Sequence, residues 1–284
     1  MKKIIWILIV PLMLLAGCLE EGTDGCAAYM SFVFQHRASV EGFDGEIAND
    51  VYLHIYRDDI LHRTLRVPYG EIAGGREYRV KKEFTGRLSV AAWAVLPDGD
   101  VSIIPSAEIN GRYSTAEIAH TPATRAAEYY HPLTDLYLGR VDVDSNKEEE
   151  SVYVVDMVNT TCGVTVNVHT DIFFDPADGD AAIYLDGPAS KCNLDLTPTG
   201  GDAVVRTAAG KKSDRTFTTN RFNVLPTPTG RTLSVRGMSG ENETFLVVTD
   251  ETASPGDEIT IDIYGAEAFI TINGWRSKYT VLQL

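Results

Sequence analysis

The feature that most constrains the fold is a succession of short apolar segments separated by turn residues. In Val51–Tyr56, aliphatic residues alternate with polar and aromatic ones, which is the period of a strand with one buried face. We therefore expect His54, on the polar side of this segment, to face solvent. Leu88–Leu96 is nearly continuous in apolar residues, and Pro97–Asp100 then turns the chain into residues 101–104. This pattern predicts a central strand followed by a hairpin.

The second half of the chain has the same style, and long amphipathic helices are hard to find in either half. Short strand-like segments with turns between them favour an all-β chain built of antiparallel β-sandwiches. Trp93 and Trp275 both lie in strand-like contexts, so we expect both in the core. The predicted strands of the second half are Ser151–Val158, Gly163–His169, Ala182–Leu185, Thr216–Leu225, Leu233–Arg236, Phe245–Thr249, Ile259–Tyr264 and Ala268–Ile272.

A length of 284 residues allows one large or two ordinary domains. The polar run 142–150 separates two strand-rich halves, and we place an N-terminal β-sandwich domain at 26–148 and a C-terminal one at 149–284. Oxygen ligands alternate at the start of the polar run, as in a calcium loop. Lys147 stands where such a loop needs Gly, and Tyr153 where it needs a bidentate Glu. No metal site is expected.

The first residues have the pattern of a bacterial lipoprotein leader. Two lysines precede the apolar run Ile4–Leu15, which is short for a bilayer-spanning helix, since such a helix needs about 20 residues. The run ends in Ala16-Gly17-Cys18, which resembles a lipobox. We expect residues 1–17 to be a signal peptide cleaved between Gly17 and Cys18, Cys18 to be lipidated, and 18–25 to form a tether. The alternative is a plain signal peptide with an incidental cysteine.

The charge of the chain limits its partners. Against 25 basic residues stand 40 acidic ones, a formal net charge of −15, so nucleic acid is a poor partner and attachment to the outer membrane must come from lipid on Cys18. Glu20 and Glu21 resemble the export signal of surface lipoproteins in Bacteroidetes, which implies an outer-membrane protein facing the cell exterior. A solvated tether is the alternative reading of that pair.

Three cysteines remain after Cys18. An oxidising cell envelope permits disulfides, and a bridge between Cys162 and Cys192 would close a loop of moderate length and stabilise the fold by roughly 3 kcal/mol. The other pairings, and the state of Cys26, stay open. No spacing of Cys and His suggests zinc.

Catalytic motifs are missing from the sequence. There is no G-x-S-x-G, HExxH, P-loop or GxGxxG ahead of a helix. The chain is therefore not expected to be an enzyme or to hold a cofactor.

The order of the pieces along the chain resembles the fimbrillin-A-associated anchor family of Bacteroidetes fimbriae. The pieces that carry the resemblance are the lipobox at Cys18, Asp24-Gly25-Cys26 before Met30–Phe34, Val51–Tyr56, the strand that ends Ala92-Trp93-Ala94, Leu133–Gly139, Val152–Val158 and Ile270–Trp275. The resemblance implies two tandem transthyretin-like β-sandwich domains. It also implies that a strand from an adjacent fimbrial subunit completes an incomplete sandwich, which is donor-strand complementation. The predicted strands of the second half are then candidates to line the open groove, and which of them accepts the donor strand stays open.

The resemblance thus implies an outer-membrane lipoprotein that forms part of the fimbrium and anchors it. One alternative is a surface glycan-binding lipoprotein, whose sugar platform could be the strand Tyr52–Tyr56 or Tyr129-Tyr130. Another is an adhesive tip subunit of the same fold. In either case, host or bacterial surface ligands would be partners.

Overall fold

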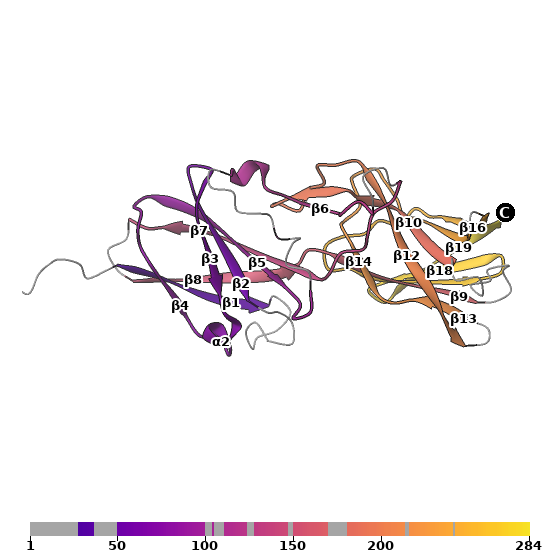
Figure 1. The fold of residues 1–284 in the computed structure, drawn as a ribbon, viewed down its shortest axis with the longest axis horizontal. Helices are drawn as coiled ribbons and strands as arrows, with labels where there is room; N and C mark the ends of the chain where they lie inside the picture. The colour runs from indigo at the N-terminus through magenta and orange to yellow at the C-terminus, as the bar shows by residue number, and fades with distance from the viewer. Residues whose placement is uncertain are drawn as a thin grey trace, which may run out of the picture.

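The computed structural model describes residues 28–36, 50–99, 104, 111–123, 128–146, 150–169, 181–213, 216–240 and 242–284. Figure 1 shows an elongated molecule of two β-rich bodies joined end to end, with the C-terminus at the tip of the second body. As expected, the regular secondary structure of the described residues is nearly all strand. The helical elements are short: α2 (Tyr69–Ile72) and the 3₁₀ turn η2 (Tyr113–Thr115). No described helix has the length and apolarity to cross a bilayer.

The N-terminal domain is a seven-stranded arrangement in the order β3-β2-β5-β7-β8-β1-β4. Most neighbours pair antiparallel, but β1 and β8 run parallel. The strands are β1 (Tyr29–His36), β2 (Val51–Arg57), β3 (Ile60–Val67), β4 (Tyr78–Lys81), β5 (Arg87–Val95), β7 (Leu136–Asp144) and β8 (Ser151–Asn159).

The position of β8 moves the boundary between the domains. A boundary at 148/149 separates this strand from β1 and β7, with which it pairs. By sheet membership, the change of domain falls between Asn159 at the end of β8 and Cys162 at the start of the next strand.

The C-terminal domain has ten strands in the order β13-β12-β10-β15-β16-β19-β18-β17-β9-β14. Here β9 and β17 are parallel, and β13 pairs with both β12 and β9, which joins the two layers along one side. The strands are β9 (Cys162–His169), β10 (Ala181–Ala189), β12 (Asp202–Ser213), β13 (Thr216–Thr219), β14 (Phe222–Val224), β15 (Ser234–Ser239), β16 (Asn242–Val248), β17 (Glu258–Tyr264), β18 (Glu267–Ile272) and β19 (Trp275–Gln283).

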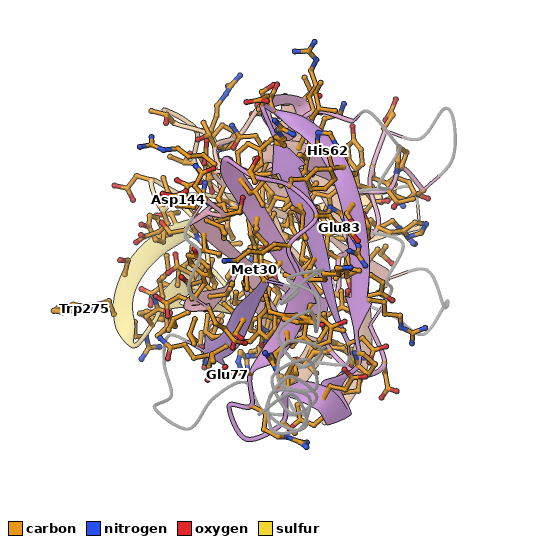
Figure 2. The ribbon with its side chains drawn as sticks, turned by 90° about the vertical axis from the view of Figure 1, so that its left-hand side faces the viewer. Met30, His62, Glu77, Glu83, Asp144 and Trp275 are labelled. Atoms are coloured by element: carbon orange, nitrogen blue, oxygen red, sulfur yellow. The ribbon has the colours of Figure 1, made fainter. Side chains whose placement is uncertain are left out.

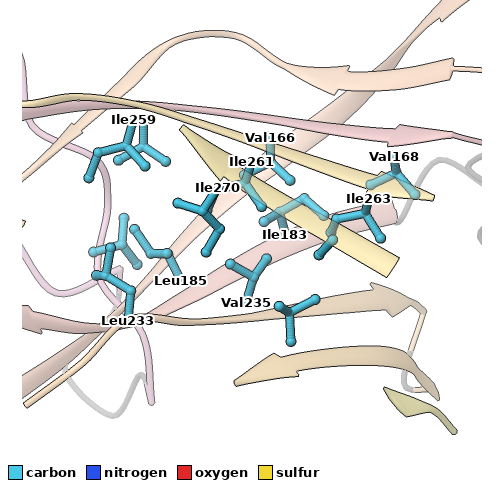
Figure 3. Packing of buried hydrophobic residues seen from close by; sticks show 14 of the residues in the cluster. Val166, Val168, Ile183, Leu185, Leu233, Val235, Ile259, Ile261, Ile263 and Ile270 are labelled. Carbon is cyan, nitrogen blue, oxygen red and sulfur yellow. The ribbon is translucent and has the colours of Figure 1, made fainter. Parts of the chain in front are cut away.

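The core of this domain follows from the alternation of its strands. The burial of β17 alternates strictly, with Ile259, Ile261 and Ile263 inside and polar residues outside. Figure 3 shows these side chains meeting Ile183 and Val235 of the opposite layer. Burial of branched aliphatic side chains stabilises such a core by about 1.5–3 kcal/mol per residue, so the period-two pattern dictates both the strand and the layer it faces.

A two-stranded sheet lies at the junction of the domains. It pairs β6 (Glu117–Ala119), from the first half of the chain, with β11 (Lys191–Asn193), from the second. Beyond β6, Tyr130 continues the crossing, because its N–H donates to Val204 O and its own carbonyl accepts from Arg206. Residues of the first half of the chain, from β6 to Tyr130, thus pair with the C-terminal domain, and we call this segment the strap.

Candidate functional site

The pairing of β7 with β8 stops after a short stretch. Only Tyr137 with Asn159 and Leu138 with Val158 are in register, so the strands diverge toward the loop that joins them. The N–H of Thr160 donates to Leu136 O. Because the direction of backbone groups alternates along a strand, the N–H and C=O of Val152, Val154 and Asp156 point to the same side, away from β1, where no described strand pairs with them.

Beside this unpaired edge of β8, exposed valine side chains lie on the outer face of the strand. Val152 and Val154 are 51% and 50% exposed, although buried residues of the same strand, such as Val155, belong to the core. Because one face of β8 packs inward and its valines face out, a strand added beside it would meet both a free row of backbone groups and apolar side chains. We call Val152, Val154 and Asp156 the β8 edge.

The outermost strands of the N-terminal sheet are built differently. On β3, Arg63 pairs with Glu83 and Arg66 with Asp50, and β4 has only four residues, two of them basic. Charged and short edge strands resist pairing with other chains. The β8 edge has nine residues in its strand and one charged residue, Asp156, beside two exposed valines, which makes it the better candidate for strand addition.

The groove was expected among the predicted strands of the second half of the chain, and one of those strands, Ser151–Val158, is β8. In the rest of that half, the two outermost strands, β13 and β14, both pair with β9, and the buried apolar residues form one cluster. The divergence of β7 and β8 lies in the N-terminal domain instead, because β8 belongs there.

The domain junction is held by a charged cluster. Arg221 donates two hydrogen bonds to Asp135, at 2.9 and 3.1 Å, and also pairs with Glu258 at 2.6 Å. Asp135 is only 7% exposed, and it also accepts from Asn159 Nδ2. These carboxylates raise the pKa of the Arg221 guanidinium, with the hydrogen bonds to Glu258 as the largest cause. The cluster ties the end of β8 to β14 and β17.

His120 is a second tie at the junction. Its Nδ1 lies 3.1 Å from His131 O, and its Nε2 accepts from the N–H of Leu225 at 3.2 Å. The ring is 3% exposed, and burial lowers its pKa to about 4. A neutral ring with its proton on Nδ1 satisfies both bonds, so His120 joins the strap to the C-terminal domain in its uncharged form.

The expected sugar platforms are not flat exposed rings. Tyr56 is 3% exposed and packs edge-on against Tyr113. Tyr52 packs against the buried apolar residues around Trp93, Ile118 and Leu194, which we call the junction cluster. Tyr129 is half-buried, edge-on to Tyr184, with the Arg206 guanidinium over its ring. A sugar stacks on an open aromatic face, and these rings are covered by protein groups.

Two single-residue expectations are wrong. His54 is 2% exposed rather than facing solvent, because the second face of β2 is covered by the junction cluster, and burial lowers its pKa to about 4. Trp93 is fully buried, as expected, but Trp275 is 84% exposed. Figure 2 shows Trp275 projecting from the side of the molecule.

Cys162 and Cys192 are both buried and are free thiols in the structure. The bridge between them is not formed there and stays a prediction. Burial raises the pKa of both thiols, that of Cys192 to about 12. Cys18, the cleavage position Gly17, Glu20, Glu21 and Cys26 lie outside the described residues.

Comparisons with known proteins agree with this architecture. Among solved structures, a polysaccharide-binding protein candidate from Bacteroides thetaiotaomicron has a TM-score of 0.64 at 12% identity, covering 88% of this chain and 98% of its own. A candidate adhesin from Bacteroides ovatus has a TM-score of 0.61 at 14% identity, with coverage of 89% and 95%. The fimbrial anchor protein Mfa2 from Porphyromonas gingivalis has a TM-score of 0.57 at 16% identity, with coverage of 88% and 97%. No curated protein matches the chain.

The fold is that of a two-domain β-sandwich protein. The model of the fimbrillin-A associated anchor proteins Mfa1 and Mfa2 matches residues 23–280. The chain belongs to this family of fimbrial proteins, which is a structural and adhesive family rather than an enzyme family. Fimbrial association implies a place at the cell surface and contact with other fimbrial subunits.

Proposed function

We propose that this protein is a lipid-anchored outer-membrane subunit that holds a fimbria at the cell surface and accepts a strand from the adjacent subunit. The family match over residues 23–280 supports the fimbrial role. The observation that carries the proposal is the β8 edge, where three residues present unpaired backbone groups beside exposed valines. The lipobox at Cys18 supports the anchor.

The anchoring step has a simple physical basis. A single acyl chain binds a membrane only marginally, whereas a multiply acylated cysteine holds firmly. The described chain begins at residue 28, at the end of the molecule opposite the C-terminus (Figure 1). Lipid on Cys18 would therefore leave the C-terminal domain pointing away from the membrane.

The experiment on anchoring replaces the lipidated cysteine. Cys18→Ala should release fimbriae into the medium, while Cys26→Ala, a cysteine outside the lipobox, should leave them on the cell. Immunoblots of the cell and medium fractions measure the distribution. Fimbriae that stay cell-bound in normal amount with Cys18→Ala would refute the anchor role.

Strand acceptance has its own test. Val154→Pro removes one N–H from the β8 edge but leaves the pairing with β1, since that N–H points away from β1. Val154→Thr keeps the N–H and the β-branched shape and serves as the matched control. Cross-linking in cells followed by mass spectrometry should show the adduct with a fimbrial subunit at least tenfold reduced for Val154→Pro and little changed for Val154→Thr.

The identity of the cross-linked partner also decides the position in the fimbria. A stalk subunit bound at the β8 edge agrees with an anchor at the base. Equal adduct in both variants would refute the β8 edge as acceptor without touching the lipid anchor, because the Cys18→Ala experiment is independent of it.

A further inference from the structure

A second strand edge lies on the C-terminal domain. β19 pairs with β18 over Trp275–Thr280, but with β16 only over Val281–Gln283. The N-terminal part of β19 therefore has a neighbour on one side only. Within the described chain, nothing pairs with its other side.

The direction of the free backbone groups follows from one hydrogen bond. The N–H of Val281 donates to Ala266 O, on the β18 side. By the alternation of an antiparallel pair, Ser277 and Tyr279 also face β18. The N–H and C=O of Arg276, Lys278 and Thr280 face away from it, but the pairing of Val247 with Val281 engages the Thr280 carbonyl with β16. Arg276, Lys278 and the N–H of Thr280 form what we call the β19 edge.

Exposed apolar side chains surround this edge. Val248, at the point where β16 diverges from β19, is 58% exposed, and Leu282 beside it is 49% exposed. Trp275 stands at the other end of the edge and is 84% exposed. Large apolar side chains gathered around an unpaired strand mark an interaction surface.

The hairpin that presents Trp275 is held by its turn geometry and by hydrogen bonds of the Asn273 side chain. Asn273 and Gly274 both have positive φ, 48° and 89°, as a type I′ hairpin turn requires. The Asn273 side chain accepts from the N–H of Glu258 at 2.9 Å and donates to Asp257 at 2.7 Å. A surface held in place before binding loses less entropy when a partner docks.

The charge of the β19 edge selects the partner. Residues 275–284 contain two cations and no acidic residue, in a protein of net charge −15. Lys278 is paired with Glu267 at 2.6 Å, but Arg276 lies over the Phe269 ring at 4.1 Å and has no carboxylate partner among the described residues. On the outward face, a complementary strand should therefore carry acidic side chains.

On the inward face, the side chains of a complementary strand should be apolar and not acidic. Tyr279 O–H donates to Asp250 and to Glu251, the latter at 2.8 Å, so carboxylates already occupy the neighbourhood of the inward side chains of β19. Further acidic groups there would be repelled, whereas apolar groups could cover Trp275. The geometry points to a specific occupant: we propose that the β19 edge binds an extended segment of another polypeptide in which acidic and apolar residues alternate.

This inference goes beyond the anchoring role and uses neither Cys18 nor the β8 edge. The probe is a capped eight-residue peptide of alternating Glu and Val, with a Lys–Val peptide of the same length as control. Of the two tryptophans in the described chain, Trp93 is fully buried and Trp275 exposed, so a blue shift of tryptophan emission reports on Trp275.

In the full chain, we expect the Glu–Val peptide to shift the emission and to slow amide hydrogen exchange at least tenfold at Arg276, Lys278 and Thr280. Lys278→Pro, which removes an N–H of the edge, should weaken binding at least tenfold. Lys278→Ala, which keeps that N–H, should bind within about threefold of the unchanged protein. Val154→Pro should bind normally, which separates this edge from the proposed function.

Four outcomes would overturn the proposal. They are no change of exchange at the three amides, equal binding of the Lys–Val peptide, undiminished binding by a folded Lys278→Pro variant, and concentration-dependent self-association that covers the same amides without peptide. The last outcome would make a second copy of the chain the occupant. Exchange on the unchanged protein decides the matter even where Lys278→Pro does not fold.

Discussion

Acidification should weaken the domain junction through His120. The ring is neutral in the folded protein, where burial lowers its pKa from 6.5 to about 4. The unfolded chain therefore binds a proton at a higher pH than the folded chain does. The contribution of the neutral His120 ring to the free energy of unfolding is fully present above about pH 6.5. It is lost as the pH falls from there to about 4.

The size of the effect follows from the shift. One pKa unit corresponds to about 1.4 kcal/mol, so a shift of this size removes about 3 kcal/mol once both states are protonated, and about 2 kcal/mol at pH 5. For a protein whose net stability is typically about 5–15 kcal/mol, this is a large fraction. His54, whose pKa is also lowered to about 4, adds a similar loss from the N-terminal domain.

Urea unfolding at pH 7.5 and pH 5 measures the effect. In His120→Gln, the difference in unfolding free energy between the two pH values should be about 2 kcal/mol smaller than in the unchanged protein. His62→Gln is the matched control, since His62 is exposed, and it should follow the unchanged protein. If unchanged protein and His120→Gln lose the same free energy on acidification, the buried neutral ring is not the cause.

Three further predictions concern packing, charge and cysteine state. A Cβ on Gly237 would lie 2.0 Å from the buried Phe245 ring, so Gly237→Ala should lower the free energy of unfolding by about 1–3 kcal/mol, while Gly201→Ala, with open space around it, should not. Arg221→Met leaves Asp135 buried without its cation and should lower the free energy of unfolding by about 1–3 kcal/mol. The control is Arg231→Met, whose exposed pair with Asp202 should contribute less than about 0.5 kcal/mol. Equal losses in thermal unfolding would contradict the role of the charged cluster around Arg221. Cys162 and Cys192 are buried and have raised thiol pKa values, so iodoacetamide at pH 8 should label neither in the native protein. After unfolding without reductant, mass spectrometry should find both labelled if they are free thiols. It should find neither labelled if they form a disulfide.

The strands were predictable because alternation is a local property. Val51–Tyr56 and Ile259–Tyr264 show it in the sequence, and both became strands with the aliphatic side inward. The domain boundary was not predictable in this way. β8 pairs in parallel with β1, and contacts such as Ser31 with Glu150 join residues 119 positions apart. A polar loop before β8 resembles a linker until that pairing is known.

The two misplaced side chains have the same origin. Alternation states which residues share a side of a strand, but not what covers that side. His54 lies on a side covered by the junction cluster, and Trp275 lies on the core side of β19 where the hairpin extends past the core. The β8 and β19 edges are likewise properties of where pairing ends, for which the sequence has no local signal.

The strap at the junction bears on how pulling forces would travel. The backbone passes between the two bodies near Ala116, near Thr134 and near Thr160. Tension between a membrane tether and a filament would therefore be divided over parallel covalent paths and the β6–β11 ladder, instead of resting on one hinge. Such a junction should resist both bending and stretching, so that the two domains move as one rigid body under load.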